Sequence, residues 1–242
     1  MATSVAIVGS SGRMGGLIDR LLTAGEDFDV HARIGRGDPL EQLDGADVVI
    51  DVTAPAVSPG VVEAALDRGI PIVVGTSGWT TDRIAPIAAR IGADPHLTAL
   101  FIPNFSLGSA LATRFAELAA PHFESIEIIE AHHSGKTDSP SGTAIRTAEL
   151  IAAARSELGP VAAPHADQRA RGQQVASVPV HSLRMSGVSA RQEVVLGGAG
   201  ETVRIVHETL SDESYEPDIL LALAAATPGA GLVVGLGALL GL

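Results

Sequence analysis

The stretch that decides the fold is Val5–Gly16, VAIVGSSGRMGG, in which a short apolar run leads into three glycines spaced three apart. The apolar run predicts a buried β-strand, and Arg13–Ala24 carries apolar residues at helical spacing. Gly9, Gly12 and Gly15 would let the turn between them come close to a pyrophosphate, whose charge the helix start attracts. The stretch therefore predicts the phosphate-binding turn of a dinucleotide-binding domain. A tight turn without a ligand is the alternative.

The first hundred residues repeat this alternation of strand and helix. Strands are predicted at Ser4–Gly9, Phe28–Ile34, Ala46–Thr53, Ile70–Thr76 and Leu97–Pro103, and further helices at Val57–Arg68 and Thr81–Ile91. Continuous apolar strands separated by helices predict an α/β fold with a Rossmann-type parallel sheet covered on both faces.

After Phe105 the pattern changes to helices beside strands that alternate apolar and polar residues. Helices are expected at Leu107–Ala119, Thr143–Glu157 and Glu216–Ala226, and strands at Phe123–His133, Ala176–Met185, Ala190–Gly197 and Glu201–Thr209. This predicts an α+β domain with a mixed sheet over residues 106–215. Residues 1–105 and 216–242 would then form the dinucleotide-binding domain.

Composition excludes several classes of function. A net charge of −12 and an aromatic content of 3% argue against nucleic-acid binding, which needs a basic face and stacking rings. The absence of cysteine excludes disulfides and thiolate chemistry and fits a reducing cytoplasm.

No signal peptide is expected, because no basic residue precedes Arg13. Ile219–Leu242 lacks charge, but Thr227–Gly229 interrupts it, which predicts a helix, a turn and a short buried strand rather than a membrane span.

The residues after the second strand bear on the choice of dinucleotide. NAD-binding domains place an acidic residue there for the ribose hydroxyls, whereas here Gly35 is flanked by Arg33 and Arg36, and Asp38 lies further into the loop. Two guanidinium groups in place of a carboxylate favour NADPH over NADH. The alternative is that both arginines are solvated loop charges.

Loops at the ends of other strands would complete the cofactor side of the sheet. Thr53, Gly75 and Thr76 follow the third and fourth strands and are candidates for contact with the nicotinamide ribose; the alternative is ordinary tight turns. Ile102–Ser106 lies at the same edge, and we expect it to lead into the second domain.

A second motif, EAHHSGKTDSPSGTA (Glu130–Ala144), joins a predicted strand to a predicted helix. A lysine, a threonine hydroxyl and the N–H groups of a helix start can bind a carboxylate, and a histidine beside them can exchange a proton. Two alternatives stay open. The histidines could satisfy polar groups of the core, or they could bind a metal. Metal binding is disfavoured because adjacent histidines on a strand point to opposite faces and no third ligand is evident, so no metal site is expected.

This motif, together with VGSSGRMG (Val8–Gly15) and IPNFSLG (Ile102–Gly108), closely resembles the dihydrodipicolinate reductase (4-hydroxy-tetrahydrodipicolinate reductase) family of bacterial lysine and diaminopimelate biosynthesis. The family signature E-x-H-H-x-x-K-x-D-x-P-S-G-T-A is matched at each fixed position from Glu130 to Ala144. The resemblance runs from end to end of the chain and points to the actinobacterial branch.

The resemblance implies an NAD(P)H-dependent reductase that delivers hydride to a cyclic unsaturated imine dicarboxylate and assembles as a homotetramer through its substrate domain. His132 would be the general acid, and Lys136 its partner and a substrate ligand. The other contacts are implied by position: the substrate carboxylate at His133, Ser141, Gly142 and Thr143, and the cofactor at Gly9, Gly12, Arg13, Met14, Gly75, Thr76, Pro103, Asn104 and Phe105.

The sequence departs from the family pattern at three informative positions. Related members carry an acid where Gly35 stands, a histidine where Arg191 stands, and more often a phenylalanine where Trp79 stands. The first departure puts NADH use in doubt, and the second a contact of the substrate domain. Another two-domain Rossmann oxidoreductase, such as an amino-acid dehydrogenase, and a non-catalytic dinucleotide sensor remain alternatives. A sensor would need neither His132 nor Lys136.

Overall fold

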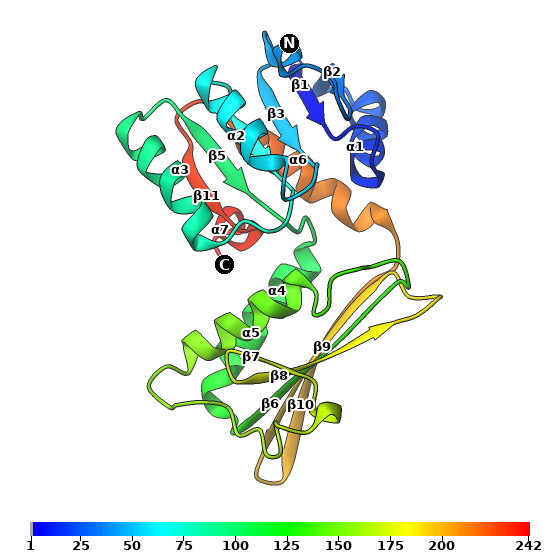
Figure 1. The fold of residues 1–242 in the computed structure, drawn as a ribbon, viewed down its shortest axis with the longest axis vertical. Coiled ribbons are helices and arrows are strands. Elements are labelled where there is room, and N and C mark those ends of the chain that lie inside the picture. Colours follow the sequence, from blue (N-terminus) through cyan, green and yellow to red (C-terminus); the bar gives the residue numbers. More distant parts are fainter. Residues whose placement is uncertain (1) are drawn as a thin grey trace. The chain divides into compact units, whose positions relative to one another are not determined.

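The computed structural model describes residues 2–242, which form two compact units. One unit comprises the residues up to Ser106 together with Asp212–Leu242, and the other comprises Leu107–Ser211 (Figure 1). Each unit has its own sheet and its own cluster of buried apolar side chains. The chain therefore leaves the first unit once and returns to it.

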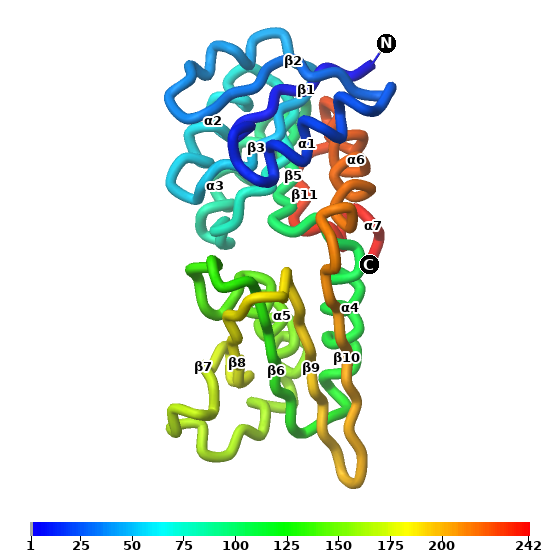
Figure 2. Tube along the Cα trace, turned by 90° about the vertical axis from the view of Figure 1, so that its right-hand side faces the viewer, coloured from blue at the N-terminus to red at the C-terminus, as the bar shows by residue number. Residues whose placement is uncertain are grey.

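The first unit is built on a six-stranded, wholly parallel sheet in the order β11-β5-β4-β3-β1-β2. Its strands are β1 (Thr3–Val8), β2 (Phe28–Ile34), β3 (Val48–Asp51), β4 (Ile72–Val74), β5 (Thr98–Phe101) and β11 (Gly231–Val234). Its helices are α1 (Arg13–Ala24), α2 (Ser58–Asp67), α3 (Thr81–Ala93), α6 (Glu216–Ala225) and α7 (Leu236–Leu240). Helices α2 and α3 lie on one face, and α1 and α6 on the other (Figure 2). The predicted Rossmann-type α/β fold is confirmed.

The two edges of this sheet differ from its centre. Strands β3, β4 and β5 are buried at every position, because helices cover both faces. The strand predicted after Thr227–Gly229 is confirmed as β11, but at the sheet edge it is half-buried rather than buried, and α7, which was not predicted, follows it. No helix within residues 2–242 is both long enough and apolar enough to cross a bilayer.

The second unit is a five-stranded mixed sheet in the order β10-β9-β6-β8-β7, as predicted for an α+β unit. Its strands are β6 (Ser125–His132), β7 (Gln173–Val175), β8 (Val178–Arg184), β9 (Ala190–Gly198) and β10 (Glu201–Thr209), and its helices α4 (Leu107–Ala119) and α5 (Gly142–Ala154). Only β6 and β8 pair in parallel. Both helices pack on one face, where small residues such as Ala116, Ala144 and Ala148 let them approach the branched side chains of the strands.

One predicted strand of this unit is confirmed as β8 with a later start, and the short strand before it, β7, was not predicted. The run Ala176–Met185 was expected to be a single strand, but it begins in the turn of a hairpin between β7 and β8. Ala176 and Ser177 form this turn with φ of 47° and 76°. Two-residue hairpins need positive φ, and glycine or asparagine usually provides it. Ala-Ser carries no such signal, so the sequence pattern concealed the turn.

Candidate active site

The glycine turn after β1 has the geometry that a dinucleotide pyrophosphate requires. Gly9 has a φ of 93°, and a Cβ atom there would lie 2.6 Å from the backbone oxygen of Val52. A Cβ on Gly15, in the first turn of α1, would overlap the Gly9 carbonyl oxygen. Both positions therefore admit only glycine. Gly12 caps α1, whose first turn holds no acidic residue and whose cap uses no side chain, which leaves its first N–H groups for an anion. Arg13 and Met14 are the first two residues of α1, directly after this turn.

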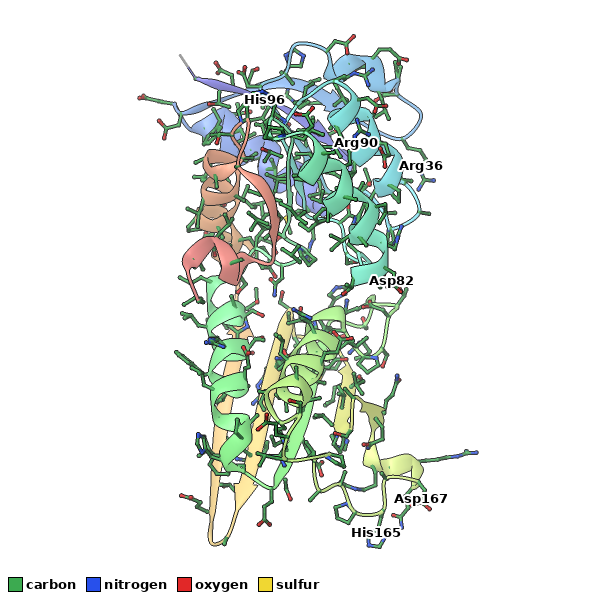
Figure 3. All side chains as sticks on the ribbon, turned by 90° about the vertical axis from the view of Figure 1, so that its left-hand side faces the viewer. Arg36, Asp82, Arg90, His96, His165 and Asp167 are labelled. Carbon is green, nitrogen blue, oxygen red and sulfur yellow. The ribbon has the colours of Figure 1, made fainter. Side chains whose placement is uncertain are left out.

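The charges after β2 are arranged differently from the prediction. Arg33 is held by Asp19 of α1, with 2.6 Å between its guanidinium nitrogen and the carboxylate. Asp38, expected to stay in the loop, accepts a hydrogen bond from the Gly35 N–H at 2.8 Å, so its carboxylate lies at the strand end. Arg36 extends into solvent (Figure 3) and has no ion pair among residues 2–242. Of the two arginines, Arg36 alone is uncommitted.

The loops after β3 and β4 bring Thr53, Gly75 and Thr76 to the same edge of the sheet. Thr53 donates its N–H and its hydroxyl to the buried Asp51 carboxylate, at 3.0 and 2.6 Å. The Gly75 N–H donates to the Asp51 carbonyl at 2.8 Å, and the Thr76 hydroxyl to the same oxygen at 3.4 Å. The polar groups of these loops are therefore organised around a single residue, which the sequence reasoning did not select.

The predicted turn Pro103–Phe105 contacts these loops in the same unit. A Cβ on Gly75 would lie 2.7 Å from the Phe105 ring, so the ring packs directly on the glycine. Phe105 is buried, Pro103 is exposed, and the Asn104 side-chain oxygen accepts a hydrogen bond from the Ser106 N–H at 3.1 Å. Phe105 thus supports the loop from beneath, whereas Pro103 and Asn104 reach the surface.

In the second unit, the signature places His132 at the end of β6 with one ring nitrogen fixed. The Nδ1 atom lies 2.6 Å from the Glu130 carboxylate, two residues earlier on the strand. His132 keeps about 18% of its side chain exposed, whereas Glu130 is fully buried. A carboxylate on Nδ1 orients the ring so that Nε2 faces outward as a proton donor, as in other carboxylate–histidine pairs.

Glu130 is the functional residue that the sequence reasoning left without a role. Arg184 of β8 binds both of its oxygens, each at 2.9 Å, and the Ser141 N–H donates to it at 3.2 Å. Burial alone would raise the pKa of the Glu130 carboxyl, but hydrogen bonds from His132 and Arg184 outweigh it and lower that pKa to about 2. Arg184 lies 54 residues away in the sequence, so no local pattern could connect the two.

Lys136 stands beside this pair but is not free. Its ammonium lies 2.7 Å from Asp138, and this ion pair is partly exposed to solvent. Burial would raise the pKa of the Asp138 carboxyl, but Lys136 lowers it below its usual value. Arg184 also donates to the Asp138 carbonyl at 2.6 Å, which ties the lysine loop to Glu130.

Of the residues predicted to bind the substrate carboxylate, some already have a structural role and others are available to a ligand. Ser141 is buried, and its hydroxyl oxygen accepts the Ala144 N–H at 3.2 Å, so it serves as the N-cap of α5. Gly142 and Thr143 form the first turn of α5, and Gly142 is exposed. His133, which is exposed, follows β6. Within residues 2–242, histidine and carboxylate side chains form no group that could hold a metal ion.

These features define a class of protein: an oxidoreductase of the Rossmann type, with a dinucleotide turn in one unit and a histidine oriented by a buried carboxylate in the other. Two family models match nearly the whole chain, dihydrodipicolinate reductase N-terminus at residues 3–105 and C-terminus at 108–240. The chain belongs to the dihydrodipicolinate reductase family and is an NAD(P)H-dependent oxidoreductase.

Relatives support the assignment over most of their length. The 4-hydroxy-tetrahydrodipicolinate reductase of Clavibacter michiganensis subsp. michiganensis is 55% identical over 242 residues, all of this chain and 87% of the relative. That of Streptomyces coelicolor is 45% identical over 96% of this chain and 95% of its own. A solved dipicolinate-bound dihydrodipicolinate reductase from Paenisporosarcina sp. TG-14 superposes with a TM-score of 0.80 at 28% identity, covering 98% of each chain. Scyllo-inositol dehydrogenase of Lactobacillus casei shares the fold alone, with a TM-score of 0.61 at 11% identity over 93% of this chain and 89% of its own.

The low pKa of Glu130 predicts how Glu130→Gln changes stability with pH. A carboxyl with a folded pKa near 2 stabilises the protein above its unfolded pKa of 4.5, and loses that contribution as the pH falls from 4.5 towards 2. We expect the variant to be less stable than the wild type at pH 7 by on the order of 3 kcal/mol, and the gap to narrow by pH 3. Urea unfolding at pH 7 and pH 3 measures the difference in the free energy of unfolding between the two proteins. Glu157→Gln, at an exposed position, is the control. A gap that is constant with pH would contradict the assignment.

Proposed function

We propose that this chain reduces 4-hydroxy-tetrahydrodipicolinate to tetrahydrodipicolinate in lysine and diaminopimelate biosynthesis. The substrate gains one hydride and one proton and loses its hydroxyl group as water, so the reaction balances. The reduced nicotinamide supplies the hydride when bound. The observation that carries the proposal is the carboxylate-oriented His132 inside a fully matched family signature. Family membership argues against an amino-acid dehydrogenase or a dinucleotide sensor.

The residues of the second unit account for the proton. Hydride addition to a conjugated imine leaves negative charge that an acid must neutralise. We propose that His132 donates this proton from Nε2, while Glu130 on Nδ1 stabilises the imidazolium beforehand. Lys136, His133 and the first N–H groups of α5 at Gly142 and Thr143 would hold a substrate carboxylate. A carboxylate ligand can replace Asp138 on Lys136, because that ion pair is partly exposed and weak.

Replacing His132 or Lys136 by alanine should reduce turnover at least a hundredfold, the scale of a lost acid catalyst, with cofactor affinity retained. An assay in which dihydrodipicolinate synthase generates the substrate in situ measures kcat, and calorimetry measures cofactor binding. His165→Ala, at an exposed histidine of the same unit (Figure 3), is the control. Near-normal turnover in both alanine variants would refute these roles.

Lys136 can also be tested without mutation, since it is the only lysine in the chain. An amine-selective reagent should modify Lys136 and the N-terminal amine alone. Dipicolinate, which occupies the related Paenisporosarcina enzyme, should protect Lys136 and leave the N-terminal amine reactive. Peptide mass spectrometry measures the extent of labelling of Lys136 and of the N-terminal amine in one experiment. Equal labelling of Lys136 with and without dipicolinate would place the ligand elsewhere.

For the cofactor, we propose that the chain uses NADPH or NADH and that any preference for NADPH rests on Arg36. Arg33 is neutralised by Asp19, so it offers little to a 2′-phosphate. Asp38 brings a carboxylate to the position where NAD-binding domains use one for the ribose hydroxyls, which favours NADH use despite Gly35. At the same ribose, the Arg36 guanidinium would therefore favour NADPH and the Asp38 carboxylate would favour NADH.

Arg36→Ala should raise the KM for NADPH about tenfold, the scale of one charge-assisted hydrogen bond, and leave the KM for NADH unchanged. Arg33→Ala is the matched control and should leave the ratio of the two KM values unchanged. Steady-state kinetics with each dinucleotide measures the two KM values for each variant. A change in the ratio in Arg33→Ala alone would restore Arg33 to the site.

We further propose a homotetramer that forms through the open face of the five-stranded sheet. Helices α4 and α5 cover the other face (Figures 1 and 2). On the open face, Ile129, Glu193 and Val206 are paired across β6, β9 and β10, and Val206 is 49% exposed. Arg191 and Arg204 pair with Glu193, so the charges of this face are largely compensated. A compensated, partly apolar face suits association with a second copy.

Val206→Glu should dissociate the tetramer, because it places an unpaired charge beside Glu193 on the open face. Size-exclusion chromatography with light scattering gives the mass of each species. Leu158→Glu, at an exposed leucine beyond the end of α5, should leave the mass unchanged. A tetramer that survives Val206→Glu would place the interface elsewhere.

A further inference from the structure

Asp51, the last residue of β3, is a fully buried carboxylate that neutral donors alone satisfy. One oxygen accepts both polar hydrogens of Thr53, and the other accepts the hydroxyl of Ser58, which is also fully buried. No cation pairs with Asp51 among residues 2–242. A buried charge without a counter-ion is costly, so its hydrogen bonds must hold firmly wherever it persists.

The hydrogen bonds continue from Ser58 to the next loop. The Trp79 indole N–H donates to the Ser58 hydroxyl oxygen at 2.9 Å. Ser58 therefore donates to Asp51 while it accepts from Trp79, and so links the loop after β3 to the loop after β4. A phenylalanine at position 79 would have no N–H to donate. We call this series of hydrogen bonds, Thr53–Asp51–Ser58–Trp79, the loop relay.

Two further contacts hold Trp79 in place. Its ring packs against Phe101 of β5 with 4.7 Å between ring centroids, and the Arg83 guanidinium lies 5.1 Å from its centroid. Arg83 itself donates to the carbonyls of Gly78 and Pro55, at 2.6 and 2.8 Å, so it bridges the same two loops from the outside. The indole is therefore held by a ring contact and a guanidinium contact in addition to its hydrogen bond to Ser58.

We propose that Asp51 is a positioning residue for the dinucleotide, which acts through the loop relay on the loops that carry Thr53, Gly75 and Thr76. This inference rests on the proposed function. The Asp51 carbonyl accepts from Gly75 and Thr76, so one residue orders both loops with its side chain and its backbone. Ordering the loops before the cofactor arrives lowers the entropy lost on binding. The relay thus contributes to cofactor affinity and only indirectly to the hydride step.

The test compares Ser58→Ala, Trp79→Phe and the double variant by calorimetry with NADH and NADPH. Trp79→Phe keeps an aromatic ring against Phe101 but removes the N–H donor. Each single variant should weaken cofactor binding about threefold to tenfold, the range for one buried hydrogen bond. The double variant should bind no more weakly than Ser58→Ala, because both changes break the same link. With saturating cofactor, kcat should stay within about twofold of the wild type.

Ser4→Ala is the matched control. It also removes a serine hydroxyl that donates to an aspartate, Asp47, at 2.8 Å, but at the start of β1 rather than at the carboxyl ends of the strands. It should lower the melting temperature without changing cofactor affinity. If Ser58→Ala and Trp79→Phe also leave cofactor affinity unchanged, whatever their melting temperatures, the positioning role is overturned. So would additive losses of affinity in the double variant.

Trp79 offers a second measurement, since it is the only tryptophan in the chain. Ser58→Ala removes the acceptor of its N–H, so its fluorescence emission should shift even without cofactor. Cofactor binding should quench this emission in the wild type by energy transfer to the reduced nicotinamide. Neither readout needs turnover, so they separate this inference from the substrate assignment. Unchanged Trp79 emission in Ser58→Ala would contradict the link itself.

Discussion

The buried carboxylate of Glu130 is the constraint on which the second unit depends. A fully buried charge must be paired and hydrogen-bonded, and Glu130 meets this requirement with Arg184, His132 and the Ser141 N–H. These partners come from β8, from β6 and from the start of α5. The pairing of β6 with β8, the start of α5 and the orientation of the His132 ring are therefore set together, and a change in any one of them leaves the charge incompletely compensated.

The first unit follows the same physical rule without a cation. Asp51 occupies the carboxyl end of a central strand, as Glu130 occupies a buried position near the end of its own, and each organises the loop that follows. Glu130 is compensated by a guanidinium and bonded to a histidine ring nitrogen, so it can remain ionised. Asp51 receives only neutral donors, which suits a role in holding loops. The difference in partners matches the two proposed roles, Glu130 in proton transfer and Asp51 in positioning the loops.

The extent of sequence prediction follows from the range of each interaction. The glycine turn was predictable, because tight backbone approach at Gly9 and Gly15 leaves a local signature. The β7–β8 hairpin was not, since Ala176 and Ser177 adopt positive φ without the residues that favour it. Arg33 was assigned to the cofactor by proximity in sequence, but its side chain pairs with Asp19 on α1. Arg184 and Trp79 were beyond reach for the same reason: their partners lie far away along the chain, and only the fold brings them together.

Arginine and lysine hold their carboxylates differently in this protein. Every ion pair of lysine or arginine with a carboxylate that the structure describes uses arginine, except the pair of Lys136 with Asp138. Arginine fits two carboxylate oxygens with its planar fork, and Arg184 does so on Glu130, which favours a permanent structural pair. A lysine ammonium is a point charge with rotatable donors, and it exchanges one oxygen ligand for another with little change in geometry. The one lysine therefore holds a carboxylate that can be exchanged, and the arginine beside it holds one that stays in place.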